Sequence, residues 1–208
     1  MHKKILLIAI LILLIPQTGF ASFKDVPETN KYYKAVKYLE DKEVIKGFGH
    51  STFKPDSFVK KVDLLKLILK ESEVEIGQNK NFITGFKDVQ KNAWYIPYVK
   101  KALDLGIIKE GDKLYPDKIL RKWEALETIF ELKGIGVQKI VGKDEKSKFA
   151  DVKKGSRFEG VALAAEKTKI FSENTFQPLK AITKGEIADI LYKLSKKQDI
   201  SEVPGITI

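Results

Sequence analysis

A four-residue pattern that decides the fold occurs three times: Phe23-Lys24-Asp25-Val26, Phe86-Lys87-Asp88-Val89 and Phe149-Ala150-Asp151-Val152. Consecutive copies begin 63 residues apart (86 − 23 and 149 − 86). The same offset aligns further apolar positions, in the sets Val36, Val99, Ala162 and Val44, Ile107, Ile170. A register that is kept through three copies indicates an internal repeat, and such a repeat governs how the rest of the chain is interpreted.

Each copy is predicted to fold as a helix, a loop and a second helix. Apolar side chains recur at helical spacing over residues 31–42, 95–105 and 158–168. A polar loop that ends in an aromatic residue and a proline follows in every copy. The second helix then opens with a charged cluster that contains Lys61, Lys122 or Lys184.

The repeats are expected to pack on one another, because a single copy cannot bury its apolar helix faces alone. Three equivalent two-helix units predict an all-α fold with pseudo-threefold symmetry. Core positions are predicted at Leu39, Leu65, Ala102, Leu126, Ala165 and Ile190.

Residues 1–21 have the three parts of a secretory signal peptide. Lys3 and Lys4 precede an apolar run at residues 5–15, Pro16 ends the run, and Gly19 and Ala21 supply small side chains before a cleavage site. A membrane-spanning helix needs about 20 apolar residues, so this run is too short for one. No later segment is apolar enough, so we expect an exported chain with no transmembrane segment after cleavage.

The composition removes many functional classes. The chain has 208 residues, no cysteine, two histidines and a formal charge of +10, which becomes +8 without Lys3 and Lys4. Disulfides, thiolate zinc sites and cysteine nucleophiles are excluded. Nucleophile-elbow, P-loop and H-E-x-x-H motifs are absent from the sequence. We therefore predict no catalytic residue, no metal and no cofactor, and expect a protein that is not an enzyme.

The repeat resembles the S-layer homology (SLH) domain, which usually occurs in threes. The similarity rests on Phe-x-Asp-Val, an aromatic first helix, Gly106-Ile107-Ile108, an aromatic-x-Pro loop and Thr183-Lys184-Gly185-Glu186, and it covers about residues 23–194. The resemblance implies a spindle around a central three-helix bundle. It also implies a cell-surface anchor, whose grooves between units bind a secondary cell-wall polysaccharide, often through a pyruvylated sugar. The predicted boundaries are residues 1–21 for the signal peptide, 22–72, 85–134 and 148–196 for the repeats, and 197–208 for a tail.

The chain departs from the family pattern at several positions. Lys61, Lys122 and Lys184 replace the arginine of the four-residue motif, and Glu43 and Lys169 stand where the first glycine of the loop is expected. Lysine is a point charge that cannot make the planar bidentate pair of arginine with a carboxylate.

Ligand binding is predicted at the second-helix lysines. Lys61, Lys122 and Lys184 lie near helix N-termini, where free N–H groups and a cation together form an anion site; the alternative is that all three are solvated. Copies two and three have more of the residues that such an anion site needs, so Lys122 and Lys184 are expected to contribute more to binding than Lys61.

Other residues have a structural interpretation beside a binding one. Trp94 either stacks on a sugar ring or belongs to the core, which its place beside an amphipathic helix favours. Asp88 and Asp151 either contact the ligand or bond local backbone before the helix, which is favoured. Gly106 shapes the loop, and Thr183 forms a capping box with Glu186. The alternating acids Glu71, Glu73 and Glu75 are expected to be solvated.

The resemblance and the predicted export favour anchoring through an anionic wall polysaccharide, located in the cell wall or S-layer. An envelope scaffold or adaptor that binds peptidoglycan or a protein partner, such as another S-layer or envelope protein, stays open. A wall-associated hydrolase is the lesser alternative. Basic helix-loop-helix units also suit nucleic acid, but export argues against that ligand.

Overall fold

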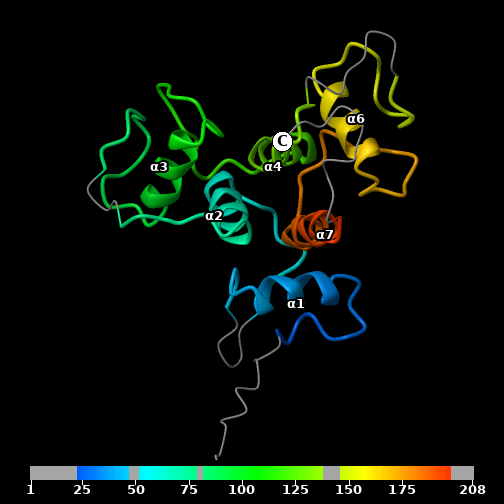
Figure 1. The fold of residues 1–208 in the computed structure, drawn as a ribbon, viewed down its shortest axis with the longest axis horizontal. Coiled ribbons are helices and arrows are strands. Elements are labelled where there is room, and N and C mark those ends of the chain that lie inside the picture. Colours follow the sequence, from blue (N-terminus) through cyan, green and yellow to red (C-terminus); the bar gives the residue numbers. More distant parts are fainter. Residues whose placement is uncertain (1–22, 47–51, 79–81, 138–145, 198–208) are drawn as a thin grey trace, which may run out of the picture.

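A computed structural model of the chain describes residues 23–46, 52–78, 82–137 and 146–197 (Figure 1). The predicted signal peptide and the predicted tail beyond residue 197 lie outside the described residues. The described part contains helices and no strand, as an all-α fold requires. The helices are α1 (Tyr33–Asp41), α2 (Lys61–Glu71), α3 (Ile96–Asp104), α4 (Lys122–Leu132), α6 (Glu159–Lys167) and α7 (Lys184–Ser195).

The second helices of the three copies, α2, α4 and α7, form the centre of the molecule, and the first helices lie outside them (Figure 1). Each first helix packs on the second helix of the preceding copy: α3 on α2, α6 on α4, and α1 on α7. The last of these pairs joins the first copy to the third. The chain is therefore a closed ring of three lobes, each built from two consecutive copies.

Three backbone hydrogen bonds close this ring at its centre. The Val59 N–H donates to the Ile182 carbonyl at 3.1 Å, Ile182 N–H donates to Leu120 at 3.0 Å, and Leu120 N–H donates to Val59 at 3.0 Å. Each of these residues lies two positions before a second helix, so every copy donates one bond and accepts one. The expected pseudo-threefold symmetry is thus present in the backbone bonding.

The same arrangement provides hydrogen-bond acceptors for the first two backbone N–H groups of each second helix. The first amide of each helix donates to a carbonyl in the loop of the next copy, in the pairs Lys61 to Lys118, Lys122 to Lys180 and Lys184 to Ser57. The second amides donate to the loop prolines, in the pairs Val62 to Pro116, Trp123 to Pro178 and Gly185 to Pro55. These amides would otherwise need a capping side chain or water. The expectation of free helix N–H groups near the lysines was therefore wrong.

The aspartates of the repeated pattern hold in place the proline-containing loops that precede the second helices. Asp25, Asp88 and Asp151 each accept two backbone hydrogen bonds at 2.6–2.8 Å, in the pairs Phe53 and Lys54, Leu114 and Tyr115, and Phe176 and Gln177. In each pair the second residue has a positive φ, between 53° and 59°. The aspartates bond backbone as expected, but the bonded loop lies 25 or more residues further along the chain.

A second left-handed position follows each first helix. It is occupied by Glu43 (φ 54°), Gly106 (φ 71°) and Lys169 (φ 50°). Glycine adopts this conformation without a steric penalty, whereas other residues lose about 1–2 kcal/mol there. The two departures from the family glycine therefore weaken the fold slightly and leave its path unchanged.

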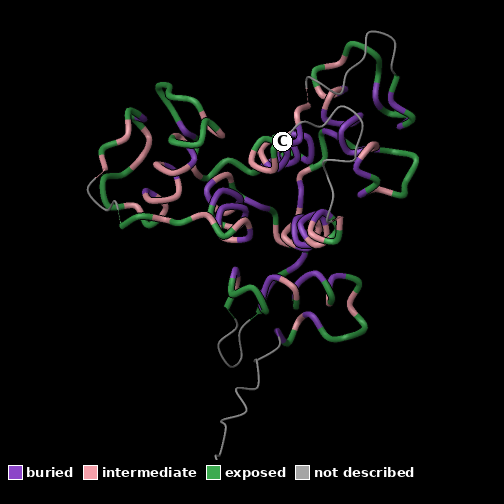
Figure 2. The backbone as a smooth tube through the Cα atoms, in the orientation of Figure 1, coloured by how far each residue is buried: buried purple, intermediate pink, exposed green. Residues whose placement is uncertain are grey.

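The core runs along the inner faces of the helices (Figure 2). The predicted core residues Leu39, Leu65, Ala102, Leu126, Ala165 and Ile190 are all at most 2% exposed, which confirms the helical spacing from which they were predicted. The Thr183–Glu186 capping box is also confirmed: Glu186 N–H donates to Thr183 Oγ1 at 3.3 Å, and Thr183 N–H donates to the Glu186 carboxylate at 2.9 Å.

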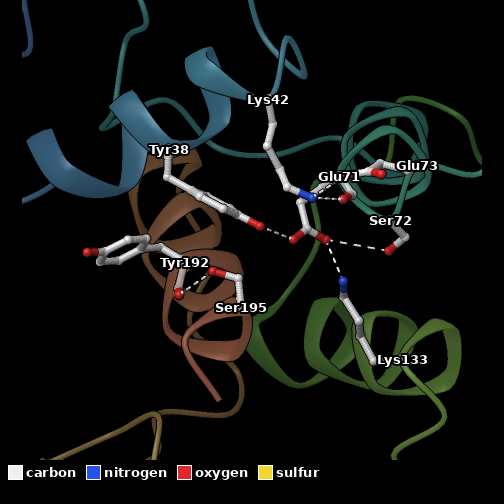
Figure 3. A network of polar contacts seen from close by, with 8 residues as sticks. All are labelled: Tyr38, Lys42, Glu71, Ser72, Glu73, Lys133, Tyr192 and Ser195. Carbon is white, nitrogen blue, oxygen red and sulfur yellow. Dashed lines mark hydrogen bonds and ion pairs between the residues drawn. The ribbon is translucent and has the colours of Figure 1, made fainter. Parts of the chain in front are cut away.

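A buried carboxylate at the C-terminal end of α2 links the first copy to the second (Figure 3). Glu71 is 2% exposed. Its carboxylate accepts a hydrogen bond from the Tyr38 hydroxyl and forms an ion pair with Lys133, both at 2.6 Å. Burial and the Glu71 carboxylate raise the pKa of the Tyr38 hydroxyl, which keeps it a donor. The expectation that Glu71 is solvated was wrong. Its spacing from Leu64 and Ile68 puts it on the buried stripe of α2.

Ring closure depends on a glycine at the start of α7. A Cβ at position 185 would overlap the ring of Tyr32, which is 9% exposed and belongs to the first copy. Gly185→Ala is predicted to lower the free energy of unfolding by about 1–3 kcal/mol, as overpacking of a filled site does. Chemical denaturation measures the loss. In the Tyr32→Ala background the same substitution should cost under about 0.5 kcal/mol, and an equal loss in both backgrounds would contradict this contact.

Candidate functional site

The packing of each copy on its predecessor also carries the second-helix lysines into neighbouring copies. Lys184 of copy three lines a groove with Phe23, Val44 and Phe53 of copy one. Lys61 of copy one lines a groove with Phe86, Ile107 and Leu114 of copy two. Lys122 of copy two lies over the ring of Phe171 in copy three, 5.1 Å from its centroid. Each lysine thus lies against the following copy, although it was predicted to act with the residues of its own copy.

The groove that holds Lys184, which we call groove 1, has a volume of about 470 Å³. Its floor is apolar, with side chains from the first copy, from α2 and from α7; they are Phe23, Val44, Ile45, Phe53, Val59, Leu64, Leu67 and Ile187. Lys46, Lys66, Lys70 and Lys184 are its charged lining residues together with one acid, Asp63. Groove 1 combines an apolar base with a surplus of positive charge.

Three lysines of groove 1, Lys46, Lys66 and Lys70, are close enough to repel one another. Burial lowers the pKa of Lys70, and the positive charges of Lys66 and Lys46 lower that pKa further. Lys70 donates to the carbonyls of Glu43 and Val44, and Lys46 pairs weakly with Glu43 at 3.6 Å. Within the described residues, Lys66 and Lys184 have no ion pair. An anionic group in this groove would therefore reduce the repulsion between Lys70 and its neighbours Lys46 and Lys66.

The second groove, which holds Lys61, is smaller and has mixed charge. Its volume is about 250 Å³, and it is lined by Lys61, Lys109, Lys113 and Lys118 together with Glu124 and Glu127. Lys118 and Glu124 form an ion pair, so part of this charge is already matched. Burial lowers the pKa of Lys61, and Lys118 lowers it further, while burial raises the pKa of Glu127. We call this groove 2.

The corresponding site in copy three, beside Lys122, is closed by an aromatic side chain. Phe171 stands where the other copies have Ile45 and Ile108, and its ring covers Lys122. Lys122 is 8% exposed, and burial lowers its pKa. In the described part of the chain no carboxylate forms an ion pair with it. The contact with the Phe171 face partly replaces the water that this ammonium has lost.

Trp94 is an exposed residue. It is 53% exposed and makes edge contacts with Tyr95 and Tyr98, and the Lys66 ammonium lies 5.2 Å from its ring centroid. The prediction that it belongs to the core was wrong. The repeat itself contained the signal, because the 63-residue offset aligns Trp94 with Lys31 and Arg157, which are also exposed.

The remaining predicted site residues have structural contacts. Asp88 and Asp151 bond the loops of their own copies, Gly106 turns the chain after α3, and Thr183 caps α7. None of these four lines groove 1 or groove 2. Their predicted part in ligand binding has no support in this geometry beyond the shaping of the loops. Lys46, Lys66 and Lys70 were not predicted as site residues, although all three line groove 1.

The S-layer homology domain model matches residues 22–62, 85–125 and 148–188, together more than half of the 208 residues. The chain belongs to the S-layer homology domain family. It is also similar to the surface-layer 125 kDa protein of Lysinibacillus sphaericus, at 28% identity over 129 residues. The match covers 59% of this chain and 11% of that protein, so the chain corresponds to a small part of its relative.

Membership of the SLH family and similarity to a surface-layer protein support a general role in cell-surface anchoring. Among the described residues, no helix has the length and apolarity to cross a bilayer. In the same residues, no cluster of three or more His, Asp or Glu side chains is arranged to hold a metal.

Removal of the buried charge at Lys122 is predicted to stabilise the SLH fold. Its folded pKa lies below the ordinary 10.5, so its burial cost is fully present at pH 7 and fades as the pH rises toward 10.5. Burial of an ion costs several kcal/mol, and the Phe171 contact returns about 2. Lys122→Met should therefore raise the free energy of unfolding at pH 7 by about 1 kcal/mol.

Denaturant titrations at a series of pH values measure this difference between Lys122→Met and the parent. The difference should shrink as the pH approaches 10.5. A destabilised Lys122→Met variant, or a difference that grows with pH, would contradict this account of Lys122.

Proposed function

We propose that this SLH chain anchors non-covalently to the cell surface by binding an anionic secondary cell-wall polysaccharide, such as one with pyruvylated sugars. The observation that carries the proposal is the position of Lys184, which reaches from α7 into the apolar groove of the first copy without an ion pair in the described residues. Groove 1 is the main site in this proposal, and groove 2 is a weaker one.

The chemistry of groove 1 suits a charged sugar. Acidic sugars present apolar C–H faces, which the floor of the groove can cover, and a carboxylate, such as that of a pyruvyl ketal, which Lys184 and Lys66 can pair with. Lysine binds such a group as a point charge. A mobile ammonium tolerates several anion geometries, so this chain should depend less on the shape of the acidic group than an arginine site would.

The charge of the whole chain adds long-range attraction. The formal charge of the chain without Lys3 and Lys4 is +8, and wall polymers are anionic, so encounter between them is favoured. Attraction of this kind is screened by salt, with a Debye length of about 8 Å at physiological ionic strength. Peptidoglycan or a protein partner would be recognised by other contacts, so retention of the chain through such a partner should not depend on the polymer.

Purified walls of Lysinibacillus sphaericus, before and after acid extraction of the secondary polymer, provide the test. The chain from residue 22 onward should be retained on intact walls, lose that retention on extracted walls, and bind less tightly as salt is added. Equal retention on both preparations would contradict the proposal and favour peptidoglycan or a protein as the partner.

Variants of the three second-helix lysines test the grooves separately. Lys184→Ala should weaken wall binding most, by about 1.5–3 kcal/mol, since a charge-assisted contact is lost in the more cationic groove. Lys61→Ala should cost less, because groove 2 already pairs part of its charge. Lys122→Ala should change binding by under about 0.5 kcal/mol, as the ammonium is covered by Phe171.

Binding isotherms on variants with parent-like circular dichroism give this ranking. The covered position of Lys122 replaces the earlier expectation that Lys122 and Lys184 both exceed Lys61. A ranking with Lys122 first would contradict the groove assignment. Three silent variants would show that these lysines do not bind the polymer.

A further inference from the structure

Trp94 forms a rigid and exposed aromatic surface beside groove 1. An indole that is more than half exposed is uncommon, since tryptophan is on average highly buried. Its ring is held by edge contacts with Tyr95 and Tyr98, whose ring centroids lie 5.5 and 6.2 Å away. The indole face is thus positioned before any ligand arrives, which lowers the entropy lost on binding.

Lys66 connects this aromatic surface to groove 1. It lines the groove together with Leu67 and Lys70 of α2, and its ammonium lies 5.2 Å from the centroid of Trp94. α3 follows Trp94 directly and packs on α2, so the two sites lie on adjacent elements. A chain that leaves the groove past Lys66 therefore meets the indole next.

We propose that groove 1 and Trp94 form one extended site that binds several consecutive units of an anionic glycan. The charged unit lies in groove 1 with Lys184 and Lys66, and a following sugar stacks on Trp94. This inference rests on the proposed function and adds to it: the protein recognises the polymer as a chain, in addition to its charged unit. Groove 2 has no equivalent surface, because the residue aligned with Trp94 in copy three is Arg157, which lies over Trp123 at 4.3 Å.

The position of Trp94 explains where the extended site lies. The residues aligned with it are Lys31, in the lobe formed by α7 and α1, and Arg157, in the lobe formed by α4 and α6. Neither offers an aromatic face. Groove 1 is formed by the lobe of α7 and α1 together with α2, and α3 also packs on α2, so the cationic groove and the exposed indole meet at α2.

The probe is polysaccharide released by hydrofluoric acid from Lysinibacillus sphaericus walls, separated into single repeat units and longer chains. The parent should bind the longer chains more tightly than the single units. Trp94→Ala should weaken binding of the longer chains about three- to tenfold, the range expected for one aromatic contact, and leave binding of single units unchanged. Trp94→Phe should keep most of the affinity, and Lys184→Ala should weaken both probes.

Intrinsic fluorescence gives a second readout, because the chain has two tryptophans and Trp123 is 8% exposed. Longer chains should change the emission of the parent, and most of that change should be lost in Trp94→Phe. Leu105→Ala, which alters another exposed apolar residue of the same repeat, is the matched control and should bind like the parent.

The outcomes separate the two proposals. If the parent binds neither probe, the proposed function fails and the extended site fails with it. If the parent binds both probes and Trp94→Ala binds the longer chains as the parent does, the extended site alone is overturned. Equal weakening of single units and longer chains by Trp94→Ala would also overturn it, since Trp94 would then act on the charged unit.

Discussion

The hydrogen bonds among Val59, Leu120 and Ile182 are the constraint on which the rest of the structure depends. They fix the three chain segments that enter α2, α4 and α7, so the second helices must start together around one axis. The amides of the first helical turn then meet the proline loops of the next copy. Once those loops are placed, each first helix can pack only on the second helix of the preceding copy. A short cycle of backbone bonds thereby determines the order of all three lobes.

The same cycle creates the candidate binding sites. A lysine at the first position of a second helix lies beside the loop that its own amide bonds, and that loop belongs to the next copy. Grooves with a lysine from one copy and an apolar floor from another follow directly from this geometry. A single repeat would contain neither a complete groove nor a complete core. The differences among the three sites then come from single residues, such as Phe171 over Lys122 and Glu124 beside Lys118.

Much of the fold could be predicted from the sequence because the 63-residue offset and helical spacing both report local structure. Leu39, Ala102 and Ile190 are buried for this reason. The offset does not report which copy a residue packs against, so Lys184 was grouped with copy three although it serves copy one. Trp94 was misjudged because helical spacing was preferred over its alignment with Lys31 and Arg157. Glu71 was predictable in principle, since it shares a helical stripe with Leu64 and Ile68, but an acid beside a polar linker suggests solvent.

Ring closure between the first and third copies is the central claim, and hydrogen exchange of α1 in a chain that ends at residue 147 tests it most directly. This chain keeps the first two copies and removes α7, the helix on which α1 packs. A nine-residue helix is not stable alone in water, so the α1 amides should lose their protection. They should regain it when residues 148–208 are added as a separate polypeptide. If the α1 amides in the chain that ends at residue 147 were as protected as in the full chain, the closed ring would be contradicted.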